Sequence, residues 1–139
     1  MKVVAFNGSA RKGGNTEQLI GFVFAELKKE GIETELVNLA GQHPHGCIAC
    51  YQCVAKKNRR CAVDIDCIND CIAKMEEADG IILGSPTYFA DMSSEMKALI
   101  DRTVASVESP AVEPLTKRER EVLSLVAQGM TNPQIAEQL

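Results

Sequence analysis

The chain alternates between short apolar runs and longer stretches with helical spacing. Strands are predicted for the β-rich runs at residues 2–6 (KVVAF), 32–39 (IETELVNL) and 80–84 (GIILG). Amphipathic helices are predicted where apolar residues recur every three or four positions, over residues 15–31, 66–80 and 93–104. Strands that alternate with helices indicate an α/β fold, a parallel sheet with helices on both faces. The continuous apolar character of VVAF and IIL predicts strands covered on both sides.

The first and last of these helices have recognisable faces and ends. Gly31 supplies a stop for the first helix, and Ser93 or Ser94 supplies an N-cap for the helix over residues 93–104. The predicted core-facing side of the first helix consists of Leu19, Ile20, Phe22, Val23, Phe24 and Leu27.

The character of the chain changes at about residue 106. Residues 106–114 (SVESPAVEP) have no periodicity and predict a linker between a domain over residues 1–105 and a segment over residues 115–139. That segment predicts two short helices. Thr116 and Glu119 form a capping box for the first helix, Gly129 ends it, and Asn132 caps the second. We therefore expect a short C-terminal helical appendage.

Composition narrows the class of protein. The 139 residues are 45% apolar and 24% charged, which is ordinary for a globular domain. No apolar run is long enough to span a membrane, and the N-terminus lacks the architecture of a signal peptide, so we expect a cytoplasmic protein. In that compartment six cysteines should stay reduced unless they bind a metal or do chemistry. A net charge of −4 and few aromatic residues give no general reason to expect nucleic-acid binding.

The stretch FNGSARKGGNT lies between the first strand and the first helix. It is glycine-rich, offers hydroxyl and amide donors and two cations, and ends at a helix N-terminus, where free N–H groups form an anion site. It is neither a G-K-[ST] loop nor a G-x-G-x-x-G loop. Such a stretch can be merely a turn, but its donors and cations favour a phosphate ligand.

A resemblance makes this site specific. GSARKGGNT, followed later by ADGIILGSPTYFADMSSEMKALIDR, resembles the flavodoxin-like NADPH-dependent FMN reductases. The resemblance implies a three-layer fold whose usual sheet order 2-1-3-4-5 is represented here by 2-1-3. It also implies two sets of FMN-binding residues. The phosphate loop would use Ser9, Arg11, Lys12, Gly14, Asn15 and Thr16, and the loop lining the flavin ring would use Ser85, Pro86, Thr87, Tyr88 and Phe89.

Four cysteines follow the second strand with the spacing C-x2-C-x2-C-x7-C: Cys47, Cys50, Cys53 and Cys61. A zinc site, a disulfide framework, an iron–sulfur cluster and no ligand at all are the alternatives. Zinc knuckles usually come as two separated pairs, and disulfides conflict with the expected compartment. In place and spacing the run resembles that of the iron–sulfur flavoproteins, which implies a [4Fe-4S] cluster on these four thiolates. Cys67 and Cys71 lie on one helical face and are expected to be small core or semi-buried residues.

The segment LTKREREVLSLVAQGMTNPQIAEQL resembles the first two helices of the LuxR-type helix-turn-helix. In that family the recognition helix comes next, and the sequence ends before it. Because DNA is read by that helix, we expect little or no DNA binding.

These features together favour an electron-transfer protein of the iron–sulfur flavoprotein type. FMN and a cluster would be its cofactors, NAD(P)H a possible electron donor, and small molecules or proteins its redox partners. No side chain has the pattern of an essential acid or base. The alternatives are an NAD(P)H-dependent flavin or quinone reductase without a cluster, a LuxR-type regulator fragment, and an inactive fusion fragment. The apolar strand at residues 80–84 lacks an expected neighbour, so we also expect a homo-oligomer.

Overall fold

The computed structural model describes residues 1–104, 134 and 138. The chain divides into two units, Met1–Glu108 and Ser109–Leu139, and the elements below belong to the first. They are β1 (Lys2–Asn7), α1 (Asn15–Lys29), β2 (Glu33–Asn38), α2 (Gln52–Lys56), α3 (Ile68–Glu77), β3 (Gly80–Gly84), β4 (Thr87–Tyr88), β5 (Asp91–Met92) and α4 (Ser94–Val104). The predicted linker and the predicted helix pair lie almost entirely outside the described residues and remain predictions.

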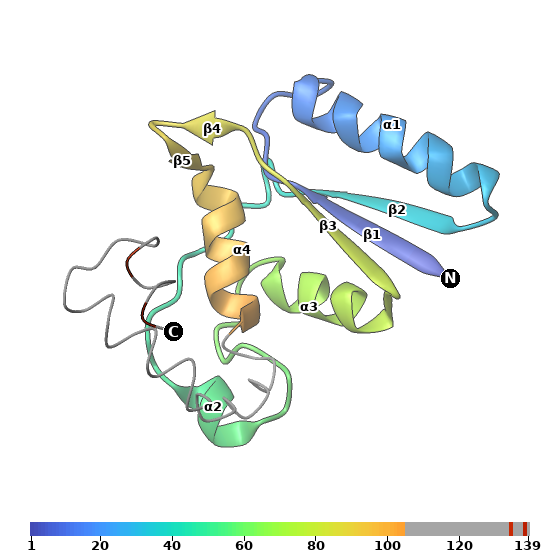
Figure 1. Cartoon of the computed structure of the whole chain (residues 1–139). Coiled ribbons are helices and arrows are strands. Elements are labelled where there is room, and N and C mark those ends of the chain that lie inside the picture. Colours follow the sequence, from blue (N-terminus) through green and yellow to red (C-terminus); the bar gives the residue numbers. More distant parts are fainter. Residues whose placement is uncertain (105–133, 135–137, 139) are drawn as a thin grey trace. The chain divides into compact units, whose positions relative to one another are not determined.

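The three long strands form a parallel sheet in the order β2-β1-β3, which confirms the predicted α/β fold of flavodoxin type (Figure 1). Side chains of β1 alternate between the two faces. Val3 and Ala5 pack with Ile20 and Phe24 of α1. On the other face, two β1 side chains pack with α3 and α4 in a cluster made of Val4, Phe6, Leu39, Ile68, Cys71, Ile72, Met96 and Leu99. Helices therefore cover both faces of β1, which explains its continuous apolar sequence.

β3 differs from the prediction that its apolar run is covered on both sides. Ile82 packs beneath α1, but Ile81 and Leu83 are each 48% exposed. Their register partners on β1 are Val4 and Phe6, so both side chains point to the face that carries α3 and α4. Among the described residues, these two helices cover β1 rather than the outer strand. The prediction was wrong for β3 because an apolar run does not reveal whether a helix lies above it.

The predicted apolar face of α1 was also too wide. Ile20 and Phe24 are buried, and Leu27 packs against them with the helical spacing of one stripe. Leu19, Phe22 and Val23 point elsewhere and are 64%, 68% and 45% exposed. One sheet face can bury only one stripe of a helix, so these three remain at the surface.

The ends of the other predicted helices and strands agree closely with the ranges predicted from the sequence. Ser93 is the N-cap of α4, because its Oγ accepts the backbone N–H of Met96 at 3.3 Å. The loop after β3 contains an antiparallel hairpin, β4–β5, which the sequence did not predict. Phe89 and Ala90 form its turn with positive φ values of 47° and 65°. No helix among the described residues has the length and apolarity needed to cross a membrane.

Candidate functional site

The loops after β1 and β3 lie side by side at the carboxyl ends of these strands. The N–H of Gly8 donates to the carbonyl oxygen of Gly84 at 2.8 Å. A Cβ at Gly8 would lie 2.6 Å from Ser93 Oγ, so glycine is needed for the loop to approach α4. From the other loop, Ser85 Oγ accepts the N–H of Ser93 at 2.9 Å. The two predicted flavin-binding loops are thus joined to each other and to the start of α4.

The loop after β1 is held by its own polar groups. Asn7 is buried, and its Oδ1 accepts the N–H of Ser9 at 3.0 Å. Ser9 Oγ in turn accepts the N–H of Arg11 at 3.2 Å. Arg11 and Lys12 are exposed. Gly14 is the N-cap of α1 and has no side chain that could accept a hydrogen bond. The backbone N–H groups in the first turn of α1 therefore have no side-chain cap, and such N–H groups can bind an anion. The loop therefore combines a backbone held by hydrogen bonds with two exposed cationic side chains.

Glu17 adds a negative charge that the sequence analysis did not consider. Its Oε2 accepts the N–H of Gly13 at 2.8 Å, so the carboxylate occupies a donor of the predicted phosphate loop. A carboxylate in the first turn of a helix is stabilised by the helix dipole. The same position would repel a phosphate. The sequence predicts that Glu17 lies in the first turn of the helix. It does not predict the hydrogen bond from Gly13, which depends on the conformation of the preceding loop.

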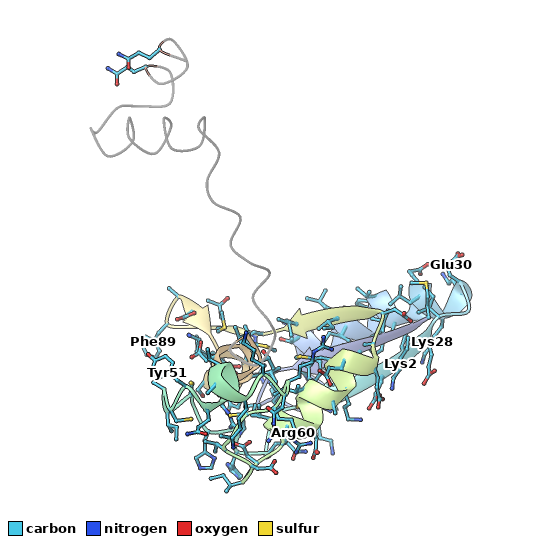
Figure 2. The ribbon with its side chains drawn as sticks, turned by 90° about the horizontal axis from the view of Figure 1, so that it is seen from below. Lys2, Lys28, Glu30, Tyr51, Arg60 and Phe89 are labelled. Atoms are coloured by element: carbon cyan, nitrogen blue, oxygen red, sulfur yellow. The ribbon has the colours of Figure 1, made fainter. Side chains whose placement is uncertain are left out.

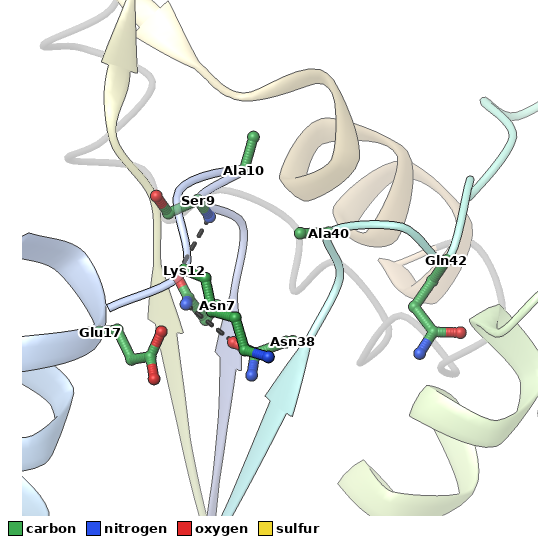
Figure 3. Close-up of a pocket in the computed structure, with 8 residues that line it drawn as sticks. All are labelled: Asn7, Ser9, Ala10, Lys12, Glu17, Asn38, Ala40 and Gln42. Carbon is green, nitrogen blue, oxygen red and sulfur yellow. Dashed lines mark hydrogen bonds between the residues drawn. The ribbon is translucent and has the colours of Figure 1, made fainter. Parts of the chain in front are cut away.

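A cavity of about 380 Å³ opens at the carboxyl ends of β1 and β2 (Figure 3). Its lining residues are Asn7, Ser9, Ala10, Lys12, Glu17, Asn38, Ala40 and Gln42. Asn7 Nδ2 donates to Asn38 Oδ1 at 2.9 Å across its floor. Of the six residues predicted to bind phosphate, Ser9 and Lys12 line this cavity. Asn38 and Gln42 were missed, because nothing in the sequence of β2 indicates that its end borders the first loop.

The predicted flavin-ring residues are placed on the hairpin that follows β3. Ser85 and Pro86 are half-buried, while Thr87, Tyr88 and Phe89 are exposed. Tyr88 is 47% exposed, and Phe89, at the turn, projects fully into solvent (Figure 2). These residues do not line the cavity at β1 and β2. They present apolar surface on the hairpin β4–β5, which follows β3.

All six cysteines are free thiols. Cys47 and Cys50 are exposed, whereas Cys53, on the short helix α2, and Cys61 are half-buried. In the described part of the chain, no three His, Cys, Asp or Glu side chains lie close enough to hold a metal ion. The structure thus does not gather the four predicted cluster ligands into one cradle.

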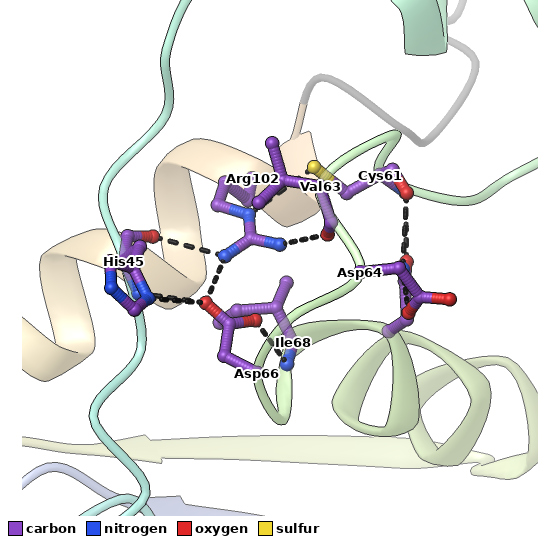
Figure 4. Close-up of polar contacts among 8 residues, drawn as sticks. His45, Cys61, Val63, Asp64, Asp66, Ile68 and Arg102 are labelled. Atoms are coloured by element: carbon purple, nitrogen blue, oxygen red, sulfur yellow. Dashed lines mark hydrogen bonds and ion pairs between the residues drawn. The ribbon is translucent and has the colours of Figure 1, made fainter.

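A buried guanidinium holds the ends of the cysteine loop (Figure 4). Arg102 of α4 donates to Asp66 Oδ2 at 2.5 Å, to the carbonyl oxygens of His45 and Val63 at 3.1 and 2.5 Å, and to Cys61 Sγ at 3.2 Å. Asp66 also accepts the N–H groups of His45 and Ile68. Burial by itself would raise the pKa of Asp66, but these N–H groups and Arg102 lower it to about 2.

The arginine could have been noticed in the sequence. Met96, Leu99 and Arg102 recur every three residues on the buried stripe of α4, and all three are 1% exposed or less. A charged residue on such a stripe indicates a buried partner. The identity of that partner, more than thirty residues earlier in the chain, could not be read from the pattern.

Comparison with known proteins decides the family. The profile described as NADPH-dependent FMN reductase matches residues 1–132. The chain belongs to the NADPH-dependent FMN reductase family. The match extends into the segment predicted to form a helix-turn-helix, which lies largely outside the described residues. The LuxR-type resemblance therefore remains a prediction.

Several relatives of this FMN reductase family member are named iron–sulfur flavoproteins. An iron–sulfur flavoprotein of Methanocaldococcus jannaschii is 44% identical over 103 residues, which are 74% of this chain and 52% of that protein. An iron–sulfur flavoprotein of Methanosarcina thermophila is 36% identical over 75% of this chain and 53% of its own length. A second iron–sulfur flavoprotein of M. jannaschii is 27% identical over 95% of this chain and 64% of its own length. The chain spans about half the length of the first two relatives.

The types of donor group present suit both cofactors, although the four thiols are not gathered at one point in the described part of the chain. Backbone N–H groups, hydroxyls and cations at the start of α1 suit a phosphate, and the adjacent hairpin offers an aromatic surface. Four free thiols suit a cluster, and two of them already accept N–H donors: Cys47 Sγ from Ala49 at 3.4 Å and Cys61 Sγ from Arg102. Cys71 is different, because burial and the neighbouring Cys67 raise the pKa of its thiol to about 12.

Proposed function

We propose that this chain is the FMN-binding part of an electron-transfer flavoprotein of the iron–sulfur type. The observation that carries the proposal is the hydrogen bond between Gly8 and Gly84, which joins the two predicted flavin loops. Open α/β sheets bind ligands at the carboxyl ends of strands, where the chain crosses from one side of the sheet to the other. β1 and β3 meet at such a point.

In this proposal the loop after β1 holds the phosphate of FMN. Ser9, Arg11, Lys12, Gly14, Asn15 and Thr16 would supply donors and charge. Asn7 keeps the backbone of Ser9 in place, and the N-terminal N–H groups of α1 would add donors for the phosphate. Ser85, Pro86, Thr87, Tyr88 and Phe89 would lie against the ring, with the aromatic side chains excluding water from one side.

The cysteine loop would hold a [4Fe-4S] cluster through Cys47, Cys50, Cys53 and Cys61. When bound, FMN accepts two electrons together as hydride or singly, and a cluster accepts one at a time. The protein's own part is binding, orientation and charge. Lys56, Lys57, Arg59 and Arg60 follow Cys53 and precede Cys61, and their positive charge favours thiolates and a negatively charged cluster. NAD(P)H is the proposed electron donor, and small molecules or redox proteins are the proposed partners.

The visible spectrum of the chain purified without oxygen tests both cofactors. Flavin bands with an added broad cluster shoulder, together with iron and sulfide in the preparation, would support the proposal. The second measurement is a titration of the colourless protein with FMN, in which quenching of flavin fluorescence reports binding. The double variant Arg11→Gln with Lys12→Gln should weaken FMN binding, and Lys97→Gln on the exposed face of α4 is its control. A chain that neither carries nor binds FMN would refute the proposal.

A cluster-free NAD(P)H-dependent flavin or quinone reductase is the second candidate. It is favoured by one observation, the separation of the four thiols among the described residues. The two candidates differ in iron content. Flavin bands without iron, even after anaerobic incubation with iron and sulfide, would select the reductase.

We further propose that the chain associates with a second copy through β3. In the described part of the chain β3 pairs only with β1, and Ile81 and Leu83 are half exposed beside its free edge. Light scattering during size-exclusion chromatography should give a mass above that of the 15.1 kDa monomer. The variant Ile81→Lys with Leu83→Lys should shift the protein to a monomer, and an unchanged mass would contradict this proposal.

A further inference from the structure

Arg102 is the most deeply buried charged side chain among the described residues, with 0% of its side chain exposed. Burying a guanidinium is costly unless its donors are satisfied. Each of its three nitrogens has a partner. Nε donates to Cys61 Sγ, Nη1 to Asp66 and the carbonyl oxygen of His45, and Nη2 to the carbonyl oxygen of Val63. The site is therefore built for this one side chain.

The partners of Arg102 come from both ends of the cysteine loop. His45 precedes Cys47, and Val63 follows Cys61. Asp66 reinforces the closure, because the carboxylate oxygen that pairs with Arg102 also accepts the N–H of His45 at 2.8 Å. The loop is thus closed at its base by an ion pair contributed by α4 and by the segment that leads into α3.

Cys61 is held more firmly than the other three cysteines of the loop. Its backbone N–H donates to Asn69 Oδ1 at 2.8 Å, and its carbonyl oxygen accepts Asn69 Nδ2 at 3.0 Å. Asn69 is buried on α3 and also binds Asp64. Cys47 and Cys50 are exposed. One thiol of the set is thus fixed by the fold, and the other three lie on the segment between His45 and Cys61.

We propose that Arg102 is a positioning residue for the cysteine loop: it closes the base of the loop and directs an N–H at the sulfur of Cys61. This inference rests on the proposed cluster only for its second effect. A donor aimed at a ligand sulfur stabilises added negative charge, so it makes the reduced cluster more favourable and raises its reduction potential. The first effect, closure of the loop, belongs to the chain itself.

Hydrogen–deuterium exchange tests the closure without any cofactor. Arg102→Lys keeps the positive charge, but a lysine ammonium lacks the planar guanidinium geometry that reaches all four acceptors. We expect exchange of the amide of His45 to become at least several-fold faster and that of Cys61, whose N–H is still bound by Asn69, to become faster by less, while exchange in β1 stays unchanged. The control Lys97→Arg is a charge-preserving substitution on the exposed face of the same helix. It should leave hydrogen exchange at His45 and at Cys61 unchanged. Unchanged exchange at His45 and Cys61 would overturn the proposal, and so would equal acceleration throughout β1.

A second variant keeps the test decisive if Arg102→Lys does not fold. Asp66→Asn retains an acceptor oxygen and removes the ion pair, and it should accelerate exchange at His45 more than at Cys61, because Asn69 still holds Cys61. Equal acceleration at both residues, or none, would contradict the assigned arrangement.

The reduction potential tests the second effect in protein that carries a cluster. Arg102→Lys should retain iron and show a more negative cluster potential in a spectroelectrochemical titration, with Lys97→Arg at the wild-type value. A potential equal to that of the wild type would reject the tuning role. If the wild-type chain binds no iron, the proposed cluster fails, and the exchange experiment alone decides whether Arg102 closes the loop.

Discussion

The N–H of Gly8 and the carbonyl oxygen of Gly84 are 2.8 Å apart, and this hydrogen bond joins the ends of two parallel strands. Neither residue tolerates a larger side chain without adjustment. A Cβ at Gly8 would meet Ser93 Oγ at 2.6 Å, and one at Gly84 would meet Ile20 Cδ1 at 2.7 Å. The first glycine lets α4 approach the sheet from one face, and the second lets α1 approach from the other. Both loops that we propose to bind flavin are joined by this contact.

Gly8→Ala should destabilise the protein and weaken FMN binding together. The added methyl group must displace Ser93 and Met96, and overpacking of this kind costs about 1–3 kcal/mol of unfolding free energy. Urea unfolding and FMN titration measure the two effects. Gly21→Ala is the matched control, because a Cβ there meets nothing within 4 Å and the residue lies inside α1. It should stabilise the protein by about 0.5–1 kcal/mol. Equal stability of the two variants would contradict the packing described for Gly8.

Glu17→Gln should strengthen the binding of FMN. The substitution removes a negative charge from the first turn of α1 and retains an oxygen that can accept the N–H of Gly13. Loss of one repulsion near the surface is worth about 0.5–1 kcal/mol, so the dissociation constant should fall about two- to fivefold at low salt. Glu26→Gln, at an exposed position on the same helix, should have no such effect. Weaker binding by Glu17→Gln would mean that its carboxylate supports the loop rather than opposing the phosphate.

The stability of the domain should fall in acid through Asp66. Its pKa lies at about 2 in the folded protein, against an ordinary value of 3.8. Because the folded pKa is the lower one, the contribution is fully present above about pH 4 and is lost as the pH falls toward about pH 2. The difference corresponds to about 2 kcal/mol. Urea unfolding at about pH 6 and about pH 3 should show roughly half of this loss, about 1 kcal/mol, because the lower pH lies between the two pKa values, and Asp66→Asn should remove this part of the pH dependence. If the unfolding free energy of the wild type and of Asp66→Asn depended on pH in the same way, Asp66 would be ruled out as the source of this pH dependence.

The cysteines should separate into two groups by their reaction with iodoacetamide. Cys47 and Cys50 are exposed and should be alkylated quickly at about pH 8, because the thiolate is the nucleophile and reagent can reach it. Cys71 is buried, and burial with the nearby Cys67 raises its pKa to about 12, so it should react slowly until the chain unfolds. Burial also raises the pKa of Cys67. Peptide mass spectrometry after timed alkylation gives the order. Rapid modification of Cys71 in the folded protein would contradict its place in the core.

The local elements were predictable because their signals are local. Ser93 could be proposed as an N-cap from its place before an apolar helix, and the extent of β3 followed from GIILG. Burial was less predictable. Ile81 and Leu83 have the same apolar character as Val4 and Phe6, yet only the latter pair is buried. Leu19, Phe22 and Val23 likewise could not be told from Ile20 and Phe24 by hydrophobicity, because burial depends on what another element covers.

The sequence by itself determined the α/β class and a glycine-rich loop suited to phosphate, because apolar periodicity and glycine-rich turns act within a few residues. The strand order 2-1-3 and the loop expected to line a flavin ring followed from the resemblance to the FMN reductases. The tertiary structure decided which groups meet. It joined Gly8 to Gly84, set Glu17 against the N–H of Gly13, and brought Arg102 to Cys61 and Asp66. These contacts link residues through the packing of helices on a sheet. Their energies depend on distance and burial, which become fixed only when the chain has folded.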